Sequence, residues 1–120
     1  MTTAELAHAF TALLKADKHD EAAEKFNAPD IVSIEAMDGP TRQVQGAAAV
    51  KAKSEWWYAN HEVHGVTVEG PWPNGDQFIL RFHVDVTPKA TGQRLAMDEM
   101  GLYTVRNGKI AEERFFYAMG

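Results

Sequence analysis

Three glutamates stand in segments whose sequence predicts β-strands. Glu35 ends a short run of branched residues, and Glu99 and Glu113 lie in two longer runs near the C-terminus. A carboxyl group in poorly solvated surroundings loses solvation energy when charged or keeps its proton. If these three share one face of a sheet, one can act as a general acid and another as a base. Proton transfer is therefore the chemistry that these residues indicate.

Other reactive side chains carry weaker signals. His61, Glu62 and His64 are metal-ligand types, but their His-Glu-x-His spacing crosses a predicted helix-to-strand junction where two imidazoles need not converge. Ser33 and Ser54 lack the strand-turn-helix context of an activated serine. The sequence has no cysteine and no glycine-rich phosphate loop. We therefore expect no metal and no cofactor.

Composition favours one globular domain over residues 1–120, with 45% hydrophobic and 24% charged residues. The 17 acidic and 12 basic residues give a formal net charge of -5, which disfavours nucleic acid or an anionic membrane as the partner. No segment approaches the roughly 20 apolar residues of a membrane span. The N-terminus also lacks the pattern of a secretory signal. We expect a soluble, cytoplasmic protein.

The N-terminal half predicts three helices. Thr2 and Glu5 form a capping-box pattern ahead of an apolar stripe, and Asp20 can cap a short second helix. The third helix is expected from Ala47 to about Asn60. Between the second and third helices, after a short strand, the glycines and proline of Met37 to Gly46 predict a loop.

From Glu62 onward the pattern changes to a period of two. A dense turn signal at Pro71 to Gly75 is followed by alternation from Gln77 to Val86, and by strands over Leu95 to Val105 and Ile110 to Tyr117. Helices segregated from an antiparallel meander define the α+β class. We expect the three helices to pack against one side of a curved sheet.

The element order resembles the nuclear transport factor 2-like superfamily, and within it the SnoaL-like proteins. The Phe-x-x-Pro-Asp segment from Phe26 to Asp30 and the run Arg106 to Ile110 carry the resemblance, which spans nearly the whole chain. It implies a cone-shaped, cystatin-like fold in which a bent antiparallel sheet wraps the helices and leaves an apolar cavity. Its members include ketosteroid isomerases, polyketide cyclases, dehydratases and epoxide hydrolases, and also modules that only bind or dimerise.

The ketosteroid-isomerase pattern keeps one of its three functional positions in this chain. The general-base carboxylate falls on Glu35, but the oxyanion-hole acid falls on Gly101 and the tyrosine of the first helix on Thr11. Such donors supply several kcal/mol of transition-state stabilisation, so we do not expect steroid isomerisation. The SnoaL-like pattern needs a single acid/base carboxyl in an apolar cavity, which Glu35, Glu99 or Glu113 can supply.

The turn at Asn107 and Gly108 decides which side chains share a face. A two-residue turn places Glu99 opposite Phe116, and a three-residue turn places it opposite Phe115; the residues alone permit both. The resemblance implies the three-residue turn. In that register the concave face holds Phe82, Val84, Val86, Met97, Glu99, Gly101, Tyr103, Glu113, Phe115 and Tyr117. The outer face then holds Arg81, His83, Asp85, Met100, Leu102 and Phe116.

In this register Glu99 and Glu113 are diagonal neighbours, so at least one of the three glutamates is expected to stay protonated near neutral pH. No lysine is expected on the concave face. Arg94 or Arg114 would reach it only in a different register, and an ion pair would then make the cluster structural.

We predict a protein that binds an apolar, ring-containing small molecule and acts as an isomerase, cyclase or hydrolase through Glu35, Glu99 and Glu113. The expected substrate-binding residues are Trp57, Phe82, Tyr103, Phe115 and Tyr117. Two alternatives stay open: a binder without catalysis, and a dimerisation module whose own aromatic side chains fill the cavity.

A homodimer through the outer face of the sheet is also expected. Met100, Leu102 and Phe116 would otherwise expose a continuous apolar patch. Charged neighbours on the same face could pair across a two-fold axis.

Overall fold

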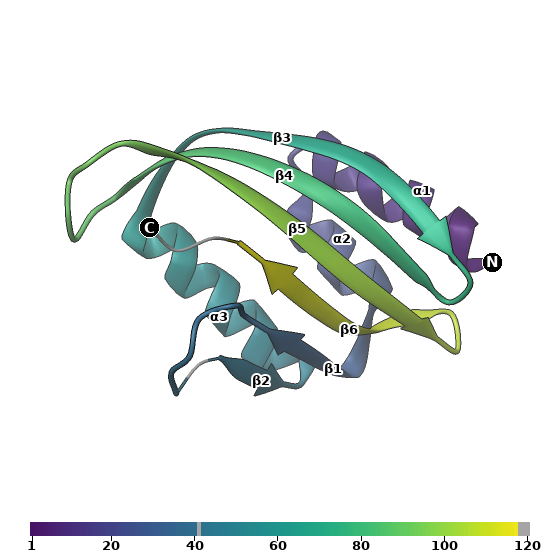
Figure 1. Ribbon diagram of the computed structural model, residues 1–120. Helices are drawn as coiled ribbons and strands as arrows, with labels where there is room; N and C mark the ends of the chain where they lie inside the picture. The colour runs from purple at the N-terminus through teal and green to yellow at the C-terminus, as the bar shows by residue number, and fades with distance from the viewer. Residues whose placement is uncertain (41, 118–120) are drawn as a thin grey trace.

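The computed structural model, which describes residues 1–40 and 42–117, is a curved sheet with helices on one side (Figure 1). In these residues the elements are α1 (Thr3–Lys15), α2 (His19–Phe26), β1 (Asn27–Ile34), β2 (Gln43–Gln45), α3 (Ala47–Asn60), β3 (His61–Asn74), β4 (Gln77–Pro88), β5 (Leu95–Arg106) and β6 (Lys109–Phe116). Their order in the sheet is β2-β1-β6-β5-β4-β3, and only the β1–β6 pair in this described sheet is parallel. The expected α+β cone is confirmed, with an open and not a closed sheet.

The helices begin close to where the sequence predicts. At α1, Thr2 Oγ1 accepts a hydrogen bond from the Glu5 amide at 3.1 Å and the Glu5 carboxylate accepts one from the Thr2 amide at 2.9 Å, so the capping box is confirmed. Helix α2 starts two residues earlier than expected, with Lys18 at the N-cap in place of Asp20. Asp20 therefore lies in the first turn and is not the cap. Its negative charge there interacts favourably with the helix dipole.

The predicted loop from Met37 to Gly46 contains a strand. Strand β2 pairs Val44 with Ser33 of β1. Strand β1 itself begins at Asn27, earlier than the run of branched residues from Ile31 to Glu35 predicts. Three residues are too few to show a period of two, so partner strands decide their conformation.

The predicted turn at Pro71 to Gly75 is wrong over most of its length, because β3 continues to Asn74. The register shifts between Glu69 and Trp72, which absorbs the irregular segment, and the chain reverses at Gly75. Since β3 is an edge strand of the described sheet, its prolines need not donate to a second neighbour.

The β5–β6 hairpin closes with a two-residue turn, so the expected three-residue turn is wrong. Arg106 pairs with Lys109 across Asn107 and Gly108, whose φ angles of 53° and 75° are both positive, as in a type I′ turn. The twist of this turn matches that of the strands it joins, which explains why it forms.

A bulge beside this turn restores the expected faces. Strand β6 carries one unpaired residue, Ala111, between the pairs that Val105 and Thr104 make. Without it, Phe116 would have joined Glu99 on the concave face. The extra residue returns the alternation along β6 to the one expected, although the partners across the strands differ.

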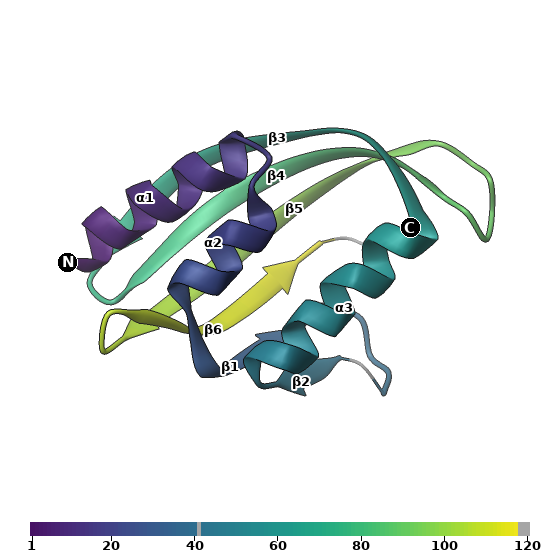
Figure 2. The ribbon, with the colours of Figure 1, turned by 180° about the vertical axis from the view of Figure 1, so that it is seen from behind.

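The core lies between the concave face and the helices, which Figure 2 shows in front of the sheet. Phe10 of α1 makes edge contacts with Phe26, Phe78 and Tyr103, at ring-centroid distances of 6.2, 6.0 and 5.3 Å. Phe78 and Tyr103 stack at 4.9 Å. These aromatic contacts fasten α1 and α2 to one half of the sheet, while α3 covers β1 and β2.

Candidate functional site

The parallel pairing of β1 with β6 brings Ser33 beside Glu113. These residues are Cα partners in the ladder, and the Ser33 hydroxyl donates to Glu113 Oε2 at 2.8 Å. Ser33 is fully buried, so its hydroxyl has little access to water as an alternative partner. The short serine side chain thus positions a carboxyl on the concave face.

The side chain of Lys53 in α3 reaches the same concave face. Its Nζ lies 2.5 Å from Glu35 Oε1 and donates to Ser33 Oγ at 2.7 Å, and it also lies 5.5 Å from the centroid of the Phe115 ring. The side chains of Lys53 and Glu35 are only 21% and 24% exposed. The expectation of a concave face without lysine is therefore wrong.

A signal for Lys53 was present in the sequence. It follows Val50 by three residues and precedes Trp57 by four, which places all three on one side of α3. A charged residue within an apolar helical stripe indicates a buried partner, here Glu35.

Tyr117 completes a line of hydrogen bonds. Its hydroxyl donates to Glu35 Oε2 at 3.0 Å, so each oxygen of that carboxylate has a donor. The bonds then run through Lys53 and Ser33 to Glu113. We call these five residues the concave network.

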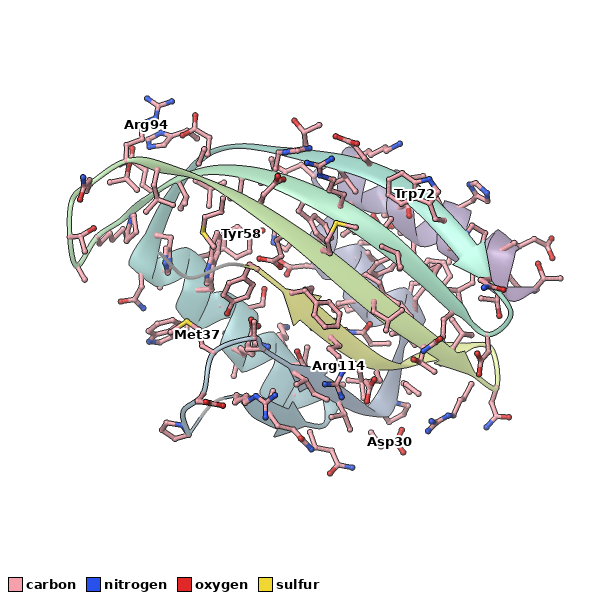
Figure 3. The ribbon with its side chains drawn as sticks, in the orientation of Figure 1. Asp30, Met37, Tyr58, Trp72, Arg94 and Arg114 are labelled. Atoms are coloured by element: carbon pink, nitrogen blue, oxygen red, sulfur yellow. The ribbon has the colours of Figure 1, made fainter. Side chains whose placement is uncertain are left out.

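Arg94 and Arg114 both lie away from the concave face. Arg94, at the hairpin between β4 and β5, donates two hydrogen bonds to Asp85 at 2.9 and 2.6 Å. Arg114 of β6 pairs with Glu112, with 3.9 Å between Nε and Oε2. Figure 3 labels both arginines: Arg94 lies near the tip of the β4–β5 hairpin, and Arg114 projects on the outer side of the sheet.

Glu99 shares the concave face but has no ion pair or side-chain hydrogen bond within the described residues. It stands opposite Phe82 of β4. The pKa of Glu99 is raised to about 7, mainly because the carboxyl group is buried and also because of the negative charge of Glu35, while the positive charge of Lys53 opposes the shift. A carboxyl group with a pKa in this range can take up or release a proton near neutral pH.

Burial also raises the pKa of Glu113, against the hydrogen bond from Ser33 and the charge of Lys53. Glu113 stands opposite Tyr103, and Gly101 opposite Phe115. On β5 the diagonal neighbour of Glu113 is therefore Gly101, and Glu99 lies two residues beyond it. The expectation that Glu99 and Glu113 are diagonal neighbours is wrong.

The five predicted substrate-binding residues do not all lie beside the concave network. Phe82 and Phe115 are half-buried beside the network, and Tyr117 belongs to it. Tyr103, 3% exposed, is part of the core. Trp57 stacks on His61 at the end of α3, with ring centroids 4.5 Å apart.

The two departures from the ketosteroid-isomerase pattern have structural reasons. A Cβ at Gly101 would lie 2.9 Å from Tyr103 Cε2 and 3.3 Å from the Phe82 ring, so these aromatic side chains occupy the place of an acid. The buried Thr11 hydroxyl donates to the Ala7 carbonyl at 2.7 Å within α1. Neither position supplies a donor to the concave face.

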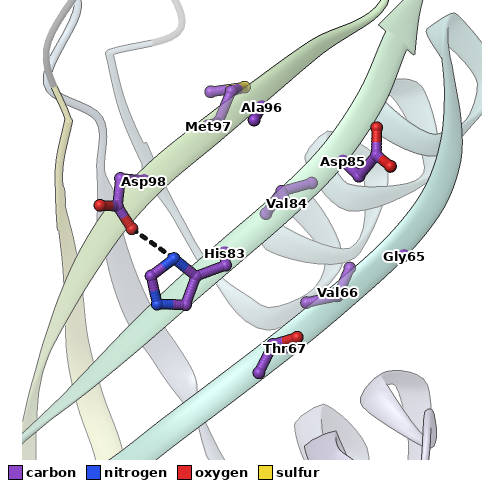
Figure 4. A pocket seen from close by; sticks show the side chains of 9 residues that line it. All are labelled: Gly65, Val66, Thr67, His83, Val84, Asp85, Ala96, Met97 and Asp98. Atoms are coloured by element: carbon purple, nitrogen blue, oxygen red, sulfur yellow. Dashed lines mark ion pairs between the residues drawn. The ribbon is translucent and has the colours of Figure 1, made fainter.

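The outer face carries a shallow depression of about 500 Å³ over β3, β4 and β5 (Figure 4). His83 stands at its edge between Glu69 and Asp98, whose carboxylate oxygens lie 2.6 and 2.8 Å from its two ring nitrogens. Residues 1–40 and 42–117 contain no group of three or more His, Asp or Glu side chains placed to hold a metal ion. None of the helices described is long and apolar enough to span a bilayer.

Fold and site together define a cone of the cystatin-like, nuclear transport factor 2-like type with a carboxyl-lined concave face. The sequence model of the SnoaL-like domain matches residues 1–117, and the chain belongs to that family. No curated protein matches the chain.

Solved structures agree with this assignment. A protein from Mesorhizobium loti, provisionally named a SnoaL-like polyketide cyclase and also a carbohydrate phosphatase, is 63% identical, with a TM-score of 0.96 over 98% of this chain and 100% of its own. A nuclear transport factor 2-like protein from Burkholderia thailandensis is 18% identical, with a TM-score of 0.83 over 98% and 92%. A provisionally named isomerase from Bacillus subtilis is 16% identical, with a TM-score of 0.78 over 98% and 90%. The last two support the fold alone.

Proposed function

We propose that this protein is a small acid–base enzyme of the isomerase or cyclase type in which Glu99 moves the proton. The observation that carries the proposal is the contrast between three carboxyls on one face: Glu35 and Glu113 are held by donors, and Glu99 is desolvated and unpaired among the described residues. The name of the 63% identical Mesorhizobium protein includes a polyketide cyclase, which is one of these two classes of enzyme.

Both forms of Glu99 are populated near neutral pH, since its pKa is raised to about 7. Its carboxylate removes a proton from the carbon beside a carbonyl, and the resulting acid returns that proton to another atom of the substrate. The rings of Phe82 and Phe115 give an apolar, ring-containing substrate its contacts.

A phosphate ester is a poor substrate for this face. Three carboxyl groups stand against one ammonium group, so a phosphate dianion would meet net repulsion. The second name of the Mesorhizobium protein thus gains no support from these residues.

Hydrogen–deuterium exchange tests the proposal without knowledge of the natural substrate. Cyclic ketones such as 2-tetralone are incubated with the protein in D₂O, and loss of the α-proton signal is followed by NMR. We expect exchange above the buffer rate, and a loss of about 100-fold or more in Glu99→Gln. Glu112→Gln, on the opposite face of β6, is the matched control. Equal rates for the wild type and Glu99→Gln would contradict the proposal.

The second candidate is a ligand-binding module without catalysis. The ion pair between Lys53 and Glu35 favours it, because pairing makes part of the carboxyl cluster structural. The burial of Tyr103 in the core also reduces the room for a ligand. In that case a ketone binds without accelerated exchange.

A further inference from the structure

Proton removal beside a carbonyl leaves negative charge on the carbonyl oxygen, and some group must stabilise that charge. The ketosteroid-isomerase pattern has hydrogen-bond donors at the positions of Gly101 and Thr11, and in this chain neither residue supplies a donor to the concave face. A different donor is therefore needed for the proposed function.

Lys53 has the geometry of such a donor. An ammonium group has three N–H bonds, and Glu35 and Ser33 accept two of them. The third has no acceptor among the described residues, and the ammonium lies 5.5 Å from the centroid of the Phe115 ring. Its two fixed partners hold the nitrogen in place before any substrate binds.

The ammonium also lies within electrostatic range of the proton-transfer group. Lys53 acts on the ionisation of Glu99 directly, and Glu99 and Phe115 both point to the concave face. A substrate ring beside Phe115 can thus present its reacting carbon to Glu99 and its oxygen to Lys53.

We propose that Lys53 binds the substrate's oxygen, and that the substrate is therefore a neutral, enolisable carbonyl compound. This inference rests on the proposed role of Glu99. The C–H bond breaks as Glu99 takes the proton, its electron pair moves to the oxygen, and the enolate is held by the third N–H of Lys53. Return of the proton from Glu99 to a different carbon, or to the same one, completes an isomerisation or an exchange.

Charge explains why this substrate class fits. Lys53 occupies the position in which a ligand's own ammonium group would pair with Glu35, so an amine is repelled. A neutral ketone brings no charge that must be desolvated. The enolate charge then develops beside an ammonium that is already oriented, which is the condition for preferential stabilisation of the transition state.

Phenolate binding tests the role of Lys53 separately from proton transfer. A phenolate is a planar ring with an oxyanion, like an enolate, and bound 4-nitrophenolate is detected by its absorbance. We expect Lys53→Met to weaken its binding about tenfold or more, because a charge-assisted hydrogen bond is lost. Lys51→Met, an exposed position on the same helix, is the matched control and should bind like the wild type.

Two further variants separate binding from folding. Glu35→Gln/Lys53→Met removes both charges of the ion pair, so no unpaired carboxylate is left to destabilise the fold. It should bind the phenolate as weakly as Lys53→Met. Glu35→Gln alone should bind it about threefold or more tightly, because a competing negative charge is removed. A purely structural ion pair predicts no such gain.

The outcomes distinguish the two proposals. Unchanged phenolate binding in Lys53→Met and in the double variant, weaker binding in Glu35→Gln, or no binding to the wild type would each overturn the role of Lys53. The exchange experiment with Glu99→Gln is independent of these results. Exchange that depends on Glu99 but not on Lys53 would leave the proposed function standing and refute this inference.

Discussion

At the scale of single residues, the concave network and Glu99 illustrate two ways of placing a carboxyl group away from water. Glu35 has a donor on each oxygen, and Glu113 has one from Ser33. Glu99 has neither, so desolvation dominates and its neutral form is favoured. The same face thus holds carboxyl groups in different surroundings, which is a common arrangement in acid–base sites.

The unpaired state of Glu99 gives the pH dependence of stability a definite sign. Because folding raises its pKa from 4.5 to about 7, folding favours the protonated form. This contribution is fully present below about pH 4.5 and is lost as the pH rises through about 7. We expect the free energy of unfolding to fall across that window by at most about 3 kcal/mol.

Urea unfolding at a series of pH values measures this slope, and Glu99→Gln should flatten it. Glu113, whose pKa is also raised, contributes with the same sign. Asp85 and Asp98 have pKa values lowered by Arg94 and Arg81, so their opposite contribution changes below about pH 3.8 and does not mask the effect. A slope that is identical in Glu99→Gln would show that Glu99 is ionised throughout.

At the scale of elements, the β5–β6 hairpin determines which residues line the concave face. Its turn places Gly108 at a φ of 75°, where a Cβ is strained although no atom lies within 4 Å. We expect Gly108→Ala to lower the free energy of unfolding by about 1–2 kcal/mol. Thermal unfolding of this variant measures the loss.

Gly65→Ala is the matched control for this strain. Gly65 lies in β3 with open space around it and without a positive φ, so little change is expected. Equal losses in the two variants would mean that the conformation of the turn is not the cause.

The sequence predicted the faces of the hairpin and not its pairing. The three-residue turn that the resemblance implies assigns Glu99 and Phe115 to one face, whereas alternation within the strands permits either register. A turn and a bulge are decided by backbone twist, which alternation does not report. The pairing expected from the three-residue turn and the pairing observed with the two-residue turn and the bulge differ by an even number of residues along β6. The same side chains therefore face the concave side in both.

The contacts between elements were less accessible to sequence reasoning. Strand β2 is too short to show a period, and its conformation depends on β1. Lys53 could be placed on the inner side of α3 from helical spacing, but its partner Glu35 is 18 positions earlier along the chain. Such a pair becomes visible only when the packing of α3 on β1 is known.

At the scale of the whole molecule, the outer face of the sheet lacks a covering layer in the described chain. Neighbouring strands expose apolar side chains there: Trp72 is 51% exposed, Ile79 37%, Met100 37% and Phe116 50%. Met100 and Phe116 are paired across β5 and β6, so this surface is continuous. We propose that it is the interface of a homodimer, since patches of this kind are usually buried.

Sedimentation at micromolar concentration tests the dimer. The wild type should have twice the 13.3 kDa mass of the chain, and Phe116→Glu should have the mass of one chain. Trp56→Glu, an exposed aromatic position on α3, should leave the dimer intact. A wild type that sediments as a monomer would refute the proposal.

The central claim is that Glu99 is the proton-transfer group, and the most direct measurement is the titration of the glutamate carboxyl carbons by carbon-detected NMR. Assignment is made by comparing the wild type with Glu99→Gln. We expect Glu99 to titrate with a midpoint close to 7, where both of its forms are present at neutral pH. A midpoint near the ordinary value of about 4.3 would contradict the account, because Glu99 would then be a solvated carboxylate with no proton to give.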